Sequence, residues 1–300
     1  MSTVRTLEDV LLRPVHWTEA LPIALRQIGV DDILMPLGLD FQSYSTARMI
    51  ARDARETRRI IGNVDPPARM KGGLVLVECL SIRAGSELDA MGLSLQRVDE
   101  STVSEEVDIL RQAWHFTHAV WPELSSSIEH LVRCIHLLKA PSHDVDCSFS
   151  TPDLPFSVFL SVPDQGSQAR IERVVEALVH ETMHLQLSLL ERRIQFVESN
   201  VPGAVAFSPW RNGERNVQGV LHALYVFVIV LRLWRLVVQK SPSGLDRRFG
   251  EARVRAISDE VEIAQHLLAA PGITNEGRKL VRQLLALGRS AHGEASGGVG

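Results

Sequence analysis

Cysteine is scarce in this chain: Cys79, Cys134 and Cys147 are the only three among 300 residues. They are widely spaced, odd in number and form no Cys-x-x-Cys pair, which argues against a disulfide scaffold and against a thiolate zinc site. Sparse, unpaired cysteine is typical of a reducing compartment, so we expect a cytoplasmic protein.

Strong charge and a secretory signal are also missing. The formal net charge of −4 is small for this length, and no basic cluster stands out, so we expect no nucleic-acid partner. The first fifteen residues lack a basic segment followed by an apolar stretch and a small-residue cleavage site. The longest apolar run, Val217–Leu231, contains His222 and is followed at once by Arg232. Because a membrane span needs about 20 apolar residues, we expect a buried helix and no membrane association.

Apolar spacing predicts a mainly α fold, more fully an α+β fold with a small sheet. Phe156–Val162 alternates like a strand, Val201–Gly213 looks like a loop, and Gly72–Leu80 fits either a strand or the start of a helix. Helices are expected at Leu7–Leu12, Trp17–Ile28, Ser45–Ile61, Ser101–Trp121, Leu124–Lys139, Ala169–Glu198, Arg215–Val238, Arg247–Ala269 and Thr274–Leu287.

The composition changes after residue 140, where prolines, serines and aspartates form a loop-like stretch. We therefore divide the chain into a helical N-terminal region, 1–140, which is a candidate for binding substrate, and a metal-binding catalytic region, 141–290. The glycine-rich tail, 291–300, is expected to be disordered.

The chemistry is concentrated in one His-Glu-x-x-His motif, His180, Glu181 and His184, within the expected helix Ala169–Glu198. Residues four apart lie on one face of an α-helix, so both imidazoles can reach one cation. In zinc peptidases the glutamate of this motif polarises the attacking water, which makes Glu181 a candidate catalytic residue. The alternative is a pair of ordinary core histidines, but two histidines and a glutamate among apolar neighbours are costly to bury without a partner such as a metal.

Two ligands do not complete a catalytic metal site, which normally has three protein ligands. A metzincin would need glycine and histidine at positions 187 and 190, and Leu187 and Leu190 exclude that family. Glu191 lies about two helical turns beyond His184, so we expect it not to reach the metal.

Several residues are candidates for the third ligand. Glu198 and Glu214 are possible, as in peptidases that use a downstream glutamate. We prefer His222, because a histidine in the most apolar stretch of the chain needs a partner; the alternative is a core histidine bonded to a carbonyl.

The segment between the two long expected helices carries two arginines, Arg211 and Arg215, after Ser208-Pro209 and Trp210. Trp210 is expected to anchor this loop. An arginine can bind a carboxylate with two parallel hydrogen bonds, so the pair favours a dicarboxylate cosubstrate near the metal. The alternative is a solvated or salt-bridged loop, for instance with Glu214.

Two other patterns are weaker indications of function. His115 and His118 are three apart on an expected helix without an obvious third partner, and a partly exposed face is the better interpretation. Ser148 and Ser150 have no base pattern nearby, so a serine nucleophile is not expected.

Three elements occur in order: HETMH, then SPWRNGER, then the apolar LH-containing GVLHALYVFV. Together with the serine-rich SFSTPDLPFSVFL, this arrangement resembles the HExxH-motif family encoded beside ribosomally made, post-translationally modified peptides. The likeness covers roughly residues 145–240 and leaves the N-terminal part unmatched.

The resemblance implies an Fe(II)- and α-ketoglutarate-dependent peptide β-hydroxylase that uses O2 on a precursor peptide. It implies His180 and His184 as iron ligands, His222 as the third, and Arg211 or Arg215 as the clamp for α-ketoglutarate. Glu181 would then position water or oxygen, hold a ligand, or contact substrate. For the fold, we expect a zincin-like HExxH helix packed against a second buried helix.

Two alternatives remain open. The first is a zinc metallopeptidase with Glu181 as general base, because imidazole ligands suit zinc and iron alike. The second is a metal-free scaffold for a peptide-modifying complex. The peptide substrate, the modified residue and the oligomeric state are left open by the sequence.

Overall fold

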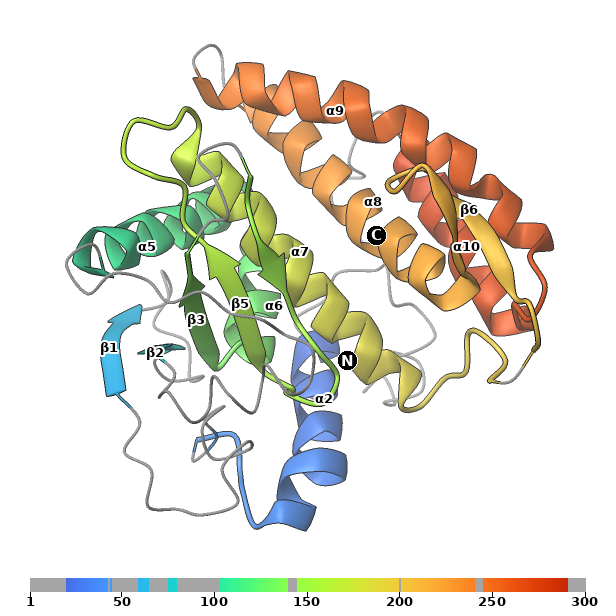
Figure 1. The fold of residues 1–300 in the computed structure, drawn as a ribbon, viewed down its shortest axis with the longest axis horizontal. Helices are drawn as coiled ribbons and strands as arrows, with labels where there is room; N and C mark the ends of the chain where they lie inside the picture. The colour runs from blue at the N-terminus through green and yellow to red at the C-terminus, as the bar shows by residue number, and fades with distance from the viewer. Residues whose placement is uncertain are drawn as a thin grey trace, which may run out of the picture. The chain divides into compact units, whose positions relative to one another are not determined.

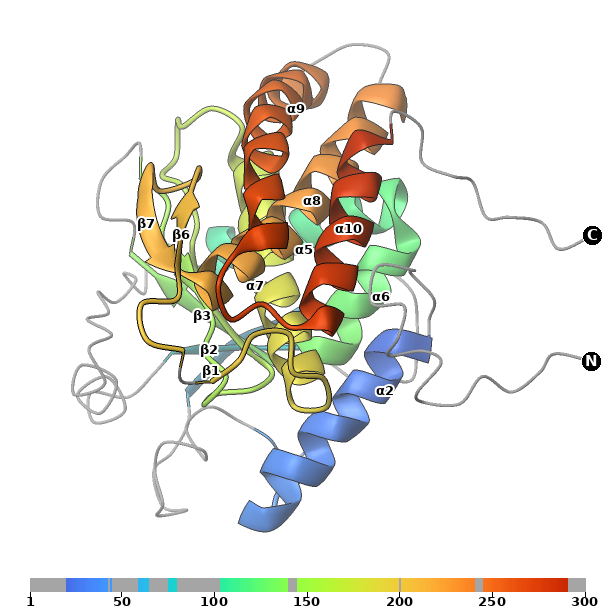
Figure 2. The ribbon, with the colours of Figure 1, turned by 90° about the vertical axis from the view of Figure 1, so that its right-hand side faces the viewer.

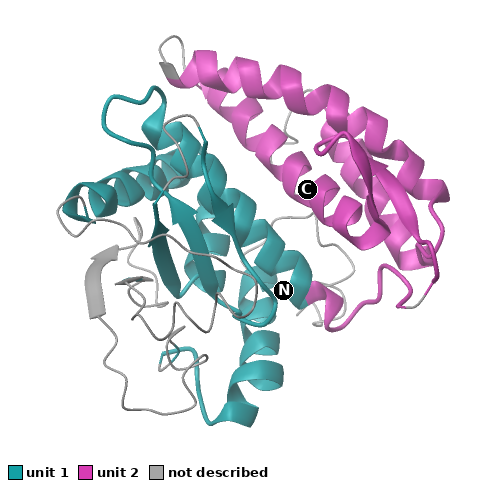
Figure 3. Cartoon of the chain, in the orientation of Figure 1, with its two compact units in different colours: residues 1–189 teal, residues 190–300 magenta. Residues whose placement is uncertain are grey.

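The computed structural model describes residues 20–42, 44, 59–64, 75–79, 103–139, 145–199, 201–240 and 245–290. Two compact units are present, Met1–Leu189 and Leu190–Gly300 (Figure 3). The fold is mainly helical with small sheets, as predicted. The expected helix Leu7–Leu12, most of the expected helix Ser45–Ile61 and the tail 291–300 lie outside the described residues.

The first unit is built on a five-stranded sheet in the order β1-β2-β3-β5-β4 (Figure 1). The inner strands β2, β3 and β5 are parallel, and the edge strands β1 and β4 are antiparallel to their neighbours. Their bounds are β1 Arg59–Val64, β2 Val75–Cys79, β3 Cys134–Leu138, β4 Ser148–Phe149 and β5 Ser157–Ser161. The sheet takes strands from both sides of residue 140, and the two compact units divide after Leu189.

The strands of this sheet test three expectations from the sequence. The expected strand Phe156–Val162 is confirmed as β5, and the ambiguous segment Gly72–Leu80 contains strand β2. The expected helix Leu124–Lys139 is wrong in its second half, because helix α6 (Pro122–Leu131) ends and β3 begins at Cys134. All five residues of β3 are buried between two neighbouring strands, and such a short apolar run has no periodicity that separates strand from helix.

Helix α6 packs against α2 (Ala20–Gly29) and α5 (Val103–Val120), and the three helices lie to one side of the sheet (Figure 2). Two short turns of helix, Val30–Leu34 and Met35–Leu37, extend α2. The helix that carries HETMH is α7, Arg170–Glu191, and it ends earlier than the expected Glu198.

An aromatic ladder fixes which way the edge strand β4 faces. Phe149 stacks on Phe159 of β5, with centroids 4.3 Å apart, and Phe159 stacks on His136 of β3 at 4.5 Å. These three residues are direct partners in the strand register. Because successive side chains of a strand point to opposite faces, Ser148 and Ser150 project from the other face.

The second unit is a helical bundle with a hairpin. Its central helix α8 (Val217–Lys240) packs against α9 (Leu245–Ile263) and α10 (Asn275–Arg289), and a short 3-10 helix, Ala264–Ala269, joins those two (Figure 2). Helix α8 is long and apolar enough to cross a membrane, yet 72% of its most apolar stretch is buried, as in a core helix.

The expected loop Val201–Gly213 is wrong in part, because strand β6 (Val205–Ser208) pairs with β7 (Gly213–Asn216). The burial of β6 alternates between exposed and buried, which is the pattern of a strand with one covered face. Asn216 then caps α8, since its Oδ1 accepts a hydrogen bond from the Gly219 amide at 2.6 Å.

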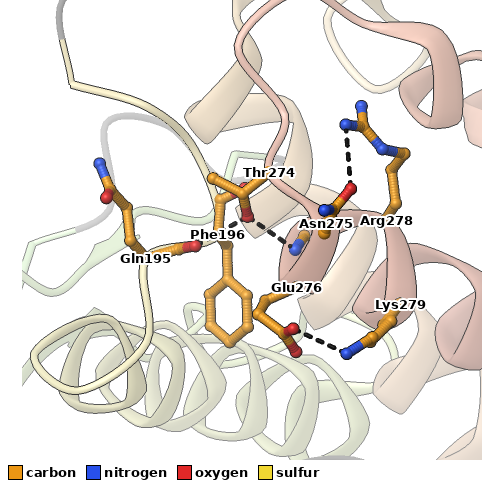
Figure 4. Close-up of polar contacts among 8 residues, drawn as sticks. Gln195, Phe196, Thr274, Asn275, Glu276, Arg278 and Lys279 are labelled. Atoms are coloured by element: carbon orange, nitrogen blue, oxygen red, sulfur yellow. Dashed lines mark hydrogen bonds and ion pairs between the residues drawn. The ribbon is translucent and has the colours of Figure 1, made fainter.

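The start of α10 is bound to the segment that follows α7 (Figure 4). Thr274 is the N-cap of α10, with its Oγ1 accepting from the Gly277 amide at 3.0 Å. The same hydroxyl lies 2.7 Å from the carbonyl oxygen of Gln195 and 3.0 Å from that of Phe196. No side chain fits at Gly277, because a Cβ there would lie 2.2 Å from the Phe196 carbonyl oxygen.

Candidate metal centre

His180 and His184 point their imidazoles toward one another from adjacent turns of α7. Their Nε2 atoms are 3.2 Å apart, and their ring centroids are 4.9 Å apart in an edge-on arrangement. Both side chains are half-buried, between the buried stripe of the helix and solvent.

The separation of the two nitrogens can be compared with the needs of a shared cation. Two imidazole nitrogens that each lie about 2.1 Å from one metal, at tetrahedral or octahedral angles, are about 3.0–3.4 Å apart. The observed 3.2 Å falls in that interval. The pair therefore fits two neighbouring positions of a divalent-metal site.

Glu181 is turned to the sheet and is only 3% exposed. Its Oε1 accepts a hydrogen bond from Ser148 Oγ at 2.7 Å, and its Oε2 accepts one from Ser150 Oγ at 2.8 Å. Burial raises the pKa of the Glu181 carboxyl to about 7, and the two serine hydrogen bonds lower it but do not offset the burial. Burial, reinforced by the nearby Glu181 carboxylate, also raises the pKa of the Cys147 thiol.

The contact of Ser148 and Ser150 with Glu181 was not predicted from the sequence. The available signal was the pattern Ser-Phe-Ser shortly before an HExxH helix, which places two hydroxyls on one face of a strand. What the sequence does not reveal is that this face meets α7, 31 and 33 residues further on.

His222 lies in the second turn of α8, in the second unit, and is 14% exposed. Its Nε2 lies 2.9 Å from Oε2 of Glu191, the last residue of α7. Gln218 Nε2 donates to the same carboxylate oxygen at 3.2 Å. A carboxylate on one ring nitrogen is a common support for a histidine whose other nitrogen binds a metal. No role was assigned to Glu191 from the sequence, and its contact with His222 was not expected.

The other possible third ligands show no such support. Glu198 is exposed after α7, and Glu214 is exposed on β7. Across the described ranges, no group of three His, Cys, Asp or Glu side chains gathers to hold a metal. His180 and His184 belong to the first unit and His222 to the second, so the third ligand stays a prediction.

The two arginines lie on the β6–β7 hairpin. Arg211 is exposed at its tip, and Arg215 on β7 extends along the first turn of α8, beside Gly219. Neither arginine forms an ion pair with Glu214 or with another carboxylate of the residues that the structure describes. Trp210 stacks on Phe227 of α8 with centroids 5.2 Å apart and planes at 6°, which confirms it as the anchor of this segment.

His115 and His118 lie on α5, exposed and half-buried respectively, in keeping with a solvated face. Comparison with protein-family models gives no match, and no curated protein is significantly similar to this chain. The family suggested by the three motifs therefore stays a prediction.

Proposed function

We propose that this chain is an Fe(II)- and α-ketoglutarate-dependent hydroxylase that acts on the β-carbon of a residue in a ribosomally made precursor peptide. The observation that carries the proposal is the 3.2 Å approach of His180 Nε2 to His184 Nε2 on a half-buried helical face. In this proposal α7 is a zincin-like HExxH helix, and His222 on α8 supplies the third ligand. Glu191 orients His222 by the hydrogen bond to its Nε2.

The hairpin provides the second part of the proposal. α-Ketoglutarate has a keto-acid end that chelates iron and a distal carboxylate that needs a cation. Arg211 and Arg215 present guanidinium groups without a carboxylate partner among the described residues, and Trp210 holds the hairpin to α8. Either arginine can bind the distal carboxylate with two hydrogen bonds. Bound iron, the keto acid and O2 supply the oxidising power, and the protein supplies positioning and a dry pocket.

The alternative is a zinc metallopeptidase, which would use the same two histidines. It requires Glu181 to offer an oxygen to a metal-bound water. Both carboxylate oxygens of Glu181 already accept hydrogen bonds from serines on the sheet side, which favours the hydroxylase. A peptidase also has no use for a pair of arginines that fits a dicarboxylate.

The test is an anaerobic titration of α-ketoglutarate into the Fe(II)-loaded protein, followed by visible absorption. A keto acid chelated to Fe(II) gives a weak charge-transfer band. We expect the band in the wild type, its loss in His184→Ala and in His222→Ala, and its weakening in Arg211→Ala or Arg215→Ala. His118→Ala is the matched control and should keep the band.

The absence of a band, together with stoichiometric zinc in the purified protein, would count against the hydroxylase and lead to assays of peptide cleavage. Failure of any divalent metal to raise the melting temperature would favour the metal-free scaffold, because a ligand that binds only the folded state must stabilise it.

A further inference from the structure

One strand holds the carboxylate of Glu181 by both of its oxygens. Ser148 and Ser150 lie two residues apart, on the same face of the chain at β4, and donate to Oε1 and Oε2. Ser150 Oγ also lies 3.4 Å from the main-chain carbonyl oxygen of Glu181. The carboxylate therefore cannot rotate without losing a bond to the sheet.

The strand that makes this contact is itself fixed. Phe149, between the two serines, stacks on Phe159, which stacks on His136 at the other side of β5. Rotation of β4 about its axis would break the stack, so the two hydroxyls are presented to α7 by an ordered part of the sheet.

Glu181 lies one residue after His180 and three residues before His184, so its side chain leaves α7 close to both imidazoles. A contact that holds Glu181 at the sheet fixes the rotation of α7 about its own axis. That rotation decides where both Nε2 atoms point. The direction in which this pair of nitrogens, 3.2 Å apart, faces thus depends on a contact on the sheet side of the helix.

We infer that Ser148 and Ser150 are positioning residues of the HExxH centre, which hold Glu181 against β4 and so aim His180 and His184 at a common cation. The inference rests on one part of the proposed function, namely that the two histidines bind a metal. It does not depend on the hydroxylation chemistry.

The test uses Co(II), whose visible spectrum reports coordination geometry, with affinity measured against a competing chelator. The double variant Ser148→Ala/Ser150→Ala should bind Co(II) about 10- to 100-fold more weakly, the range that loss of an outer contact typically gives, with altered visible bands. Ser148→Thr/Ser150→Thr keeps both hydroxyls and should restore affinity and spectrum. Ser157→Ala is the matched control, because it removes the hydroxyl of a different serine of the same sheet, one that bonds Tyr44 at 2.6 Å.

Glu181 itself gives a second measurement. Glu181→Gln keeps a planar group that can bond both hydroxyls and should bind Co(II) within a few-fold of the wild type, whereas Glu181→Ala should lose as much affinity as the double serine variant. If the double serine variant does not fold, the two single alanine variants are expected to show smaller losses of the same kind.

Wild-type affinity and spectrum in the serine variants would overturn the inference, and so would equal losses in Ser157→Ala. A wild type that binds no Co(II) would overturn both the inference and the proposed function. If Co(II) binding is weakened in the serine variants as expected but the iron protein shows no α-ketoglutarate band, the hydroxylase alone is overturned and the positioning role is supported.

Discussion

Acidification should destabilise the first unit through one buried histidine, His130 of α6. Its side chain is buried, and its Nδ1 has no hydrogen-bond partner among the described residues. Burial, aided by the positive charge of Arg26 on α2, lowers the pKa of His130 from 6.5 to about 4. Glu129, beside His130 on α6, interacts with Arg26 in turn.

The direction of the stability change with pH follows from the lowered pKa of His130. His130 is neutral in the folded protein down to about pH 4, while in the unfolded chain it takes up a proton as the pH falls through 6.5. The unfolded state therefore binds more protons between these values, and stability is lost as the pH falls from about 6.5 toward 4. A fully expressed shift amounts to about 2 kcal/mol between pH 8 and pH 5, and residual solvent screening reduces this to about 1–2 kcal/mol.

The assay is urea unfolding at pH 8 and at pH 5. A separate hydrogen-exchange measurement on Pro122–Leu131 reports on α6 itself. The quantity compared is the loss of unfolding free energy between the two pH values in the wild type and in His130→Gln. We expect the variant to lose about 1–2 kcal/mol less than the wild type, because other titrating groups act alike in both. Equal losses would refute the reasoning, and His118→Gln, at a half-buried site on α5, should match the wild type.

Three further predictions concern the second unit. Gly277→Ala should destabilise it by about 1–3 kcal/mol in urea unfolding, because the new Cβ would meet the Phe196 carbonyl oxygen at 2.2 Å; an unchanged midpoint would contradict the close approach. Thr274→Ala should cost about 1 kcal/mol through loss of the α10 cap, measured in the same way, whereas Thr274→Ser should cost little. Trp210→Leu removes the stack on Phe227 and should weaken α-ketoglutarate binding several-fold in the charge-transfer titration with iron affinity unchanged, and equal loss of both would show that the hairpin has no separate role.

The HExxH helix, the strand before it and the start of α10 could be predicted from the sequence because each has a local cause. Helical spacing of apolar residues marks α7 and α10, and alternation marks β5. Each signal lies within a few residues of the element that it specifies, and in each case the structure follows it.

The errors have a different origin. Strand β3 was taken for helix because a five-residue apolar run is buried all round in either structure. The Glu181 contact with β4 and the Glu191 contact with His222 each join residues about 31 apart, and nothing local specifies such a pairing. Glu191 was considered only for its distance from His184 along α7, so its contact with His222 was not expected.

The aromatic ladder has a consequence for tolerance to substitution. A shift of β4 by one residue would put Phe149 toward α7 and both serine hydroxyls on the ring face, because strand side chains alternate strictly. The choice between these two registers is made by Phe159, a fully buried ring that belongs to the face opposite the helix. A deep mutational scan scored by metal binding should therefore place Phe159 among the sensitive positions. It would stand out as a remote determinant, although its own side chain holds no atom that could ligate a metal.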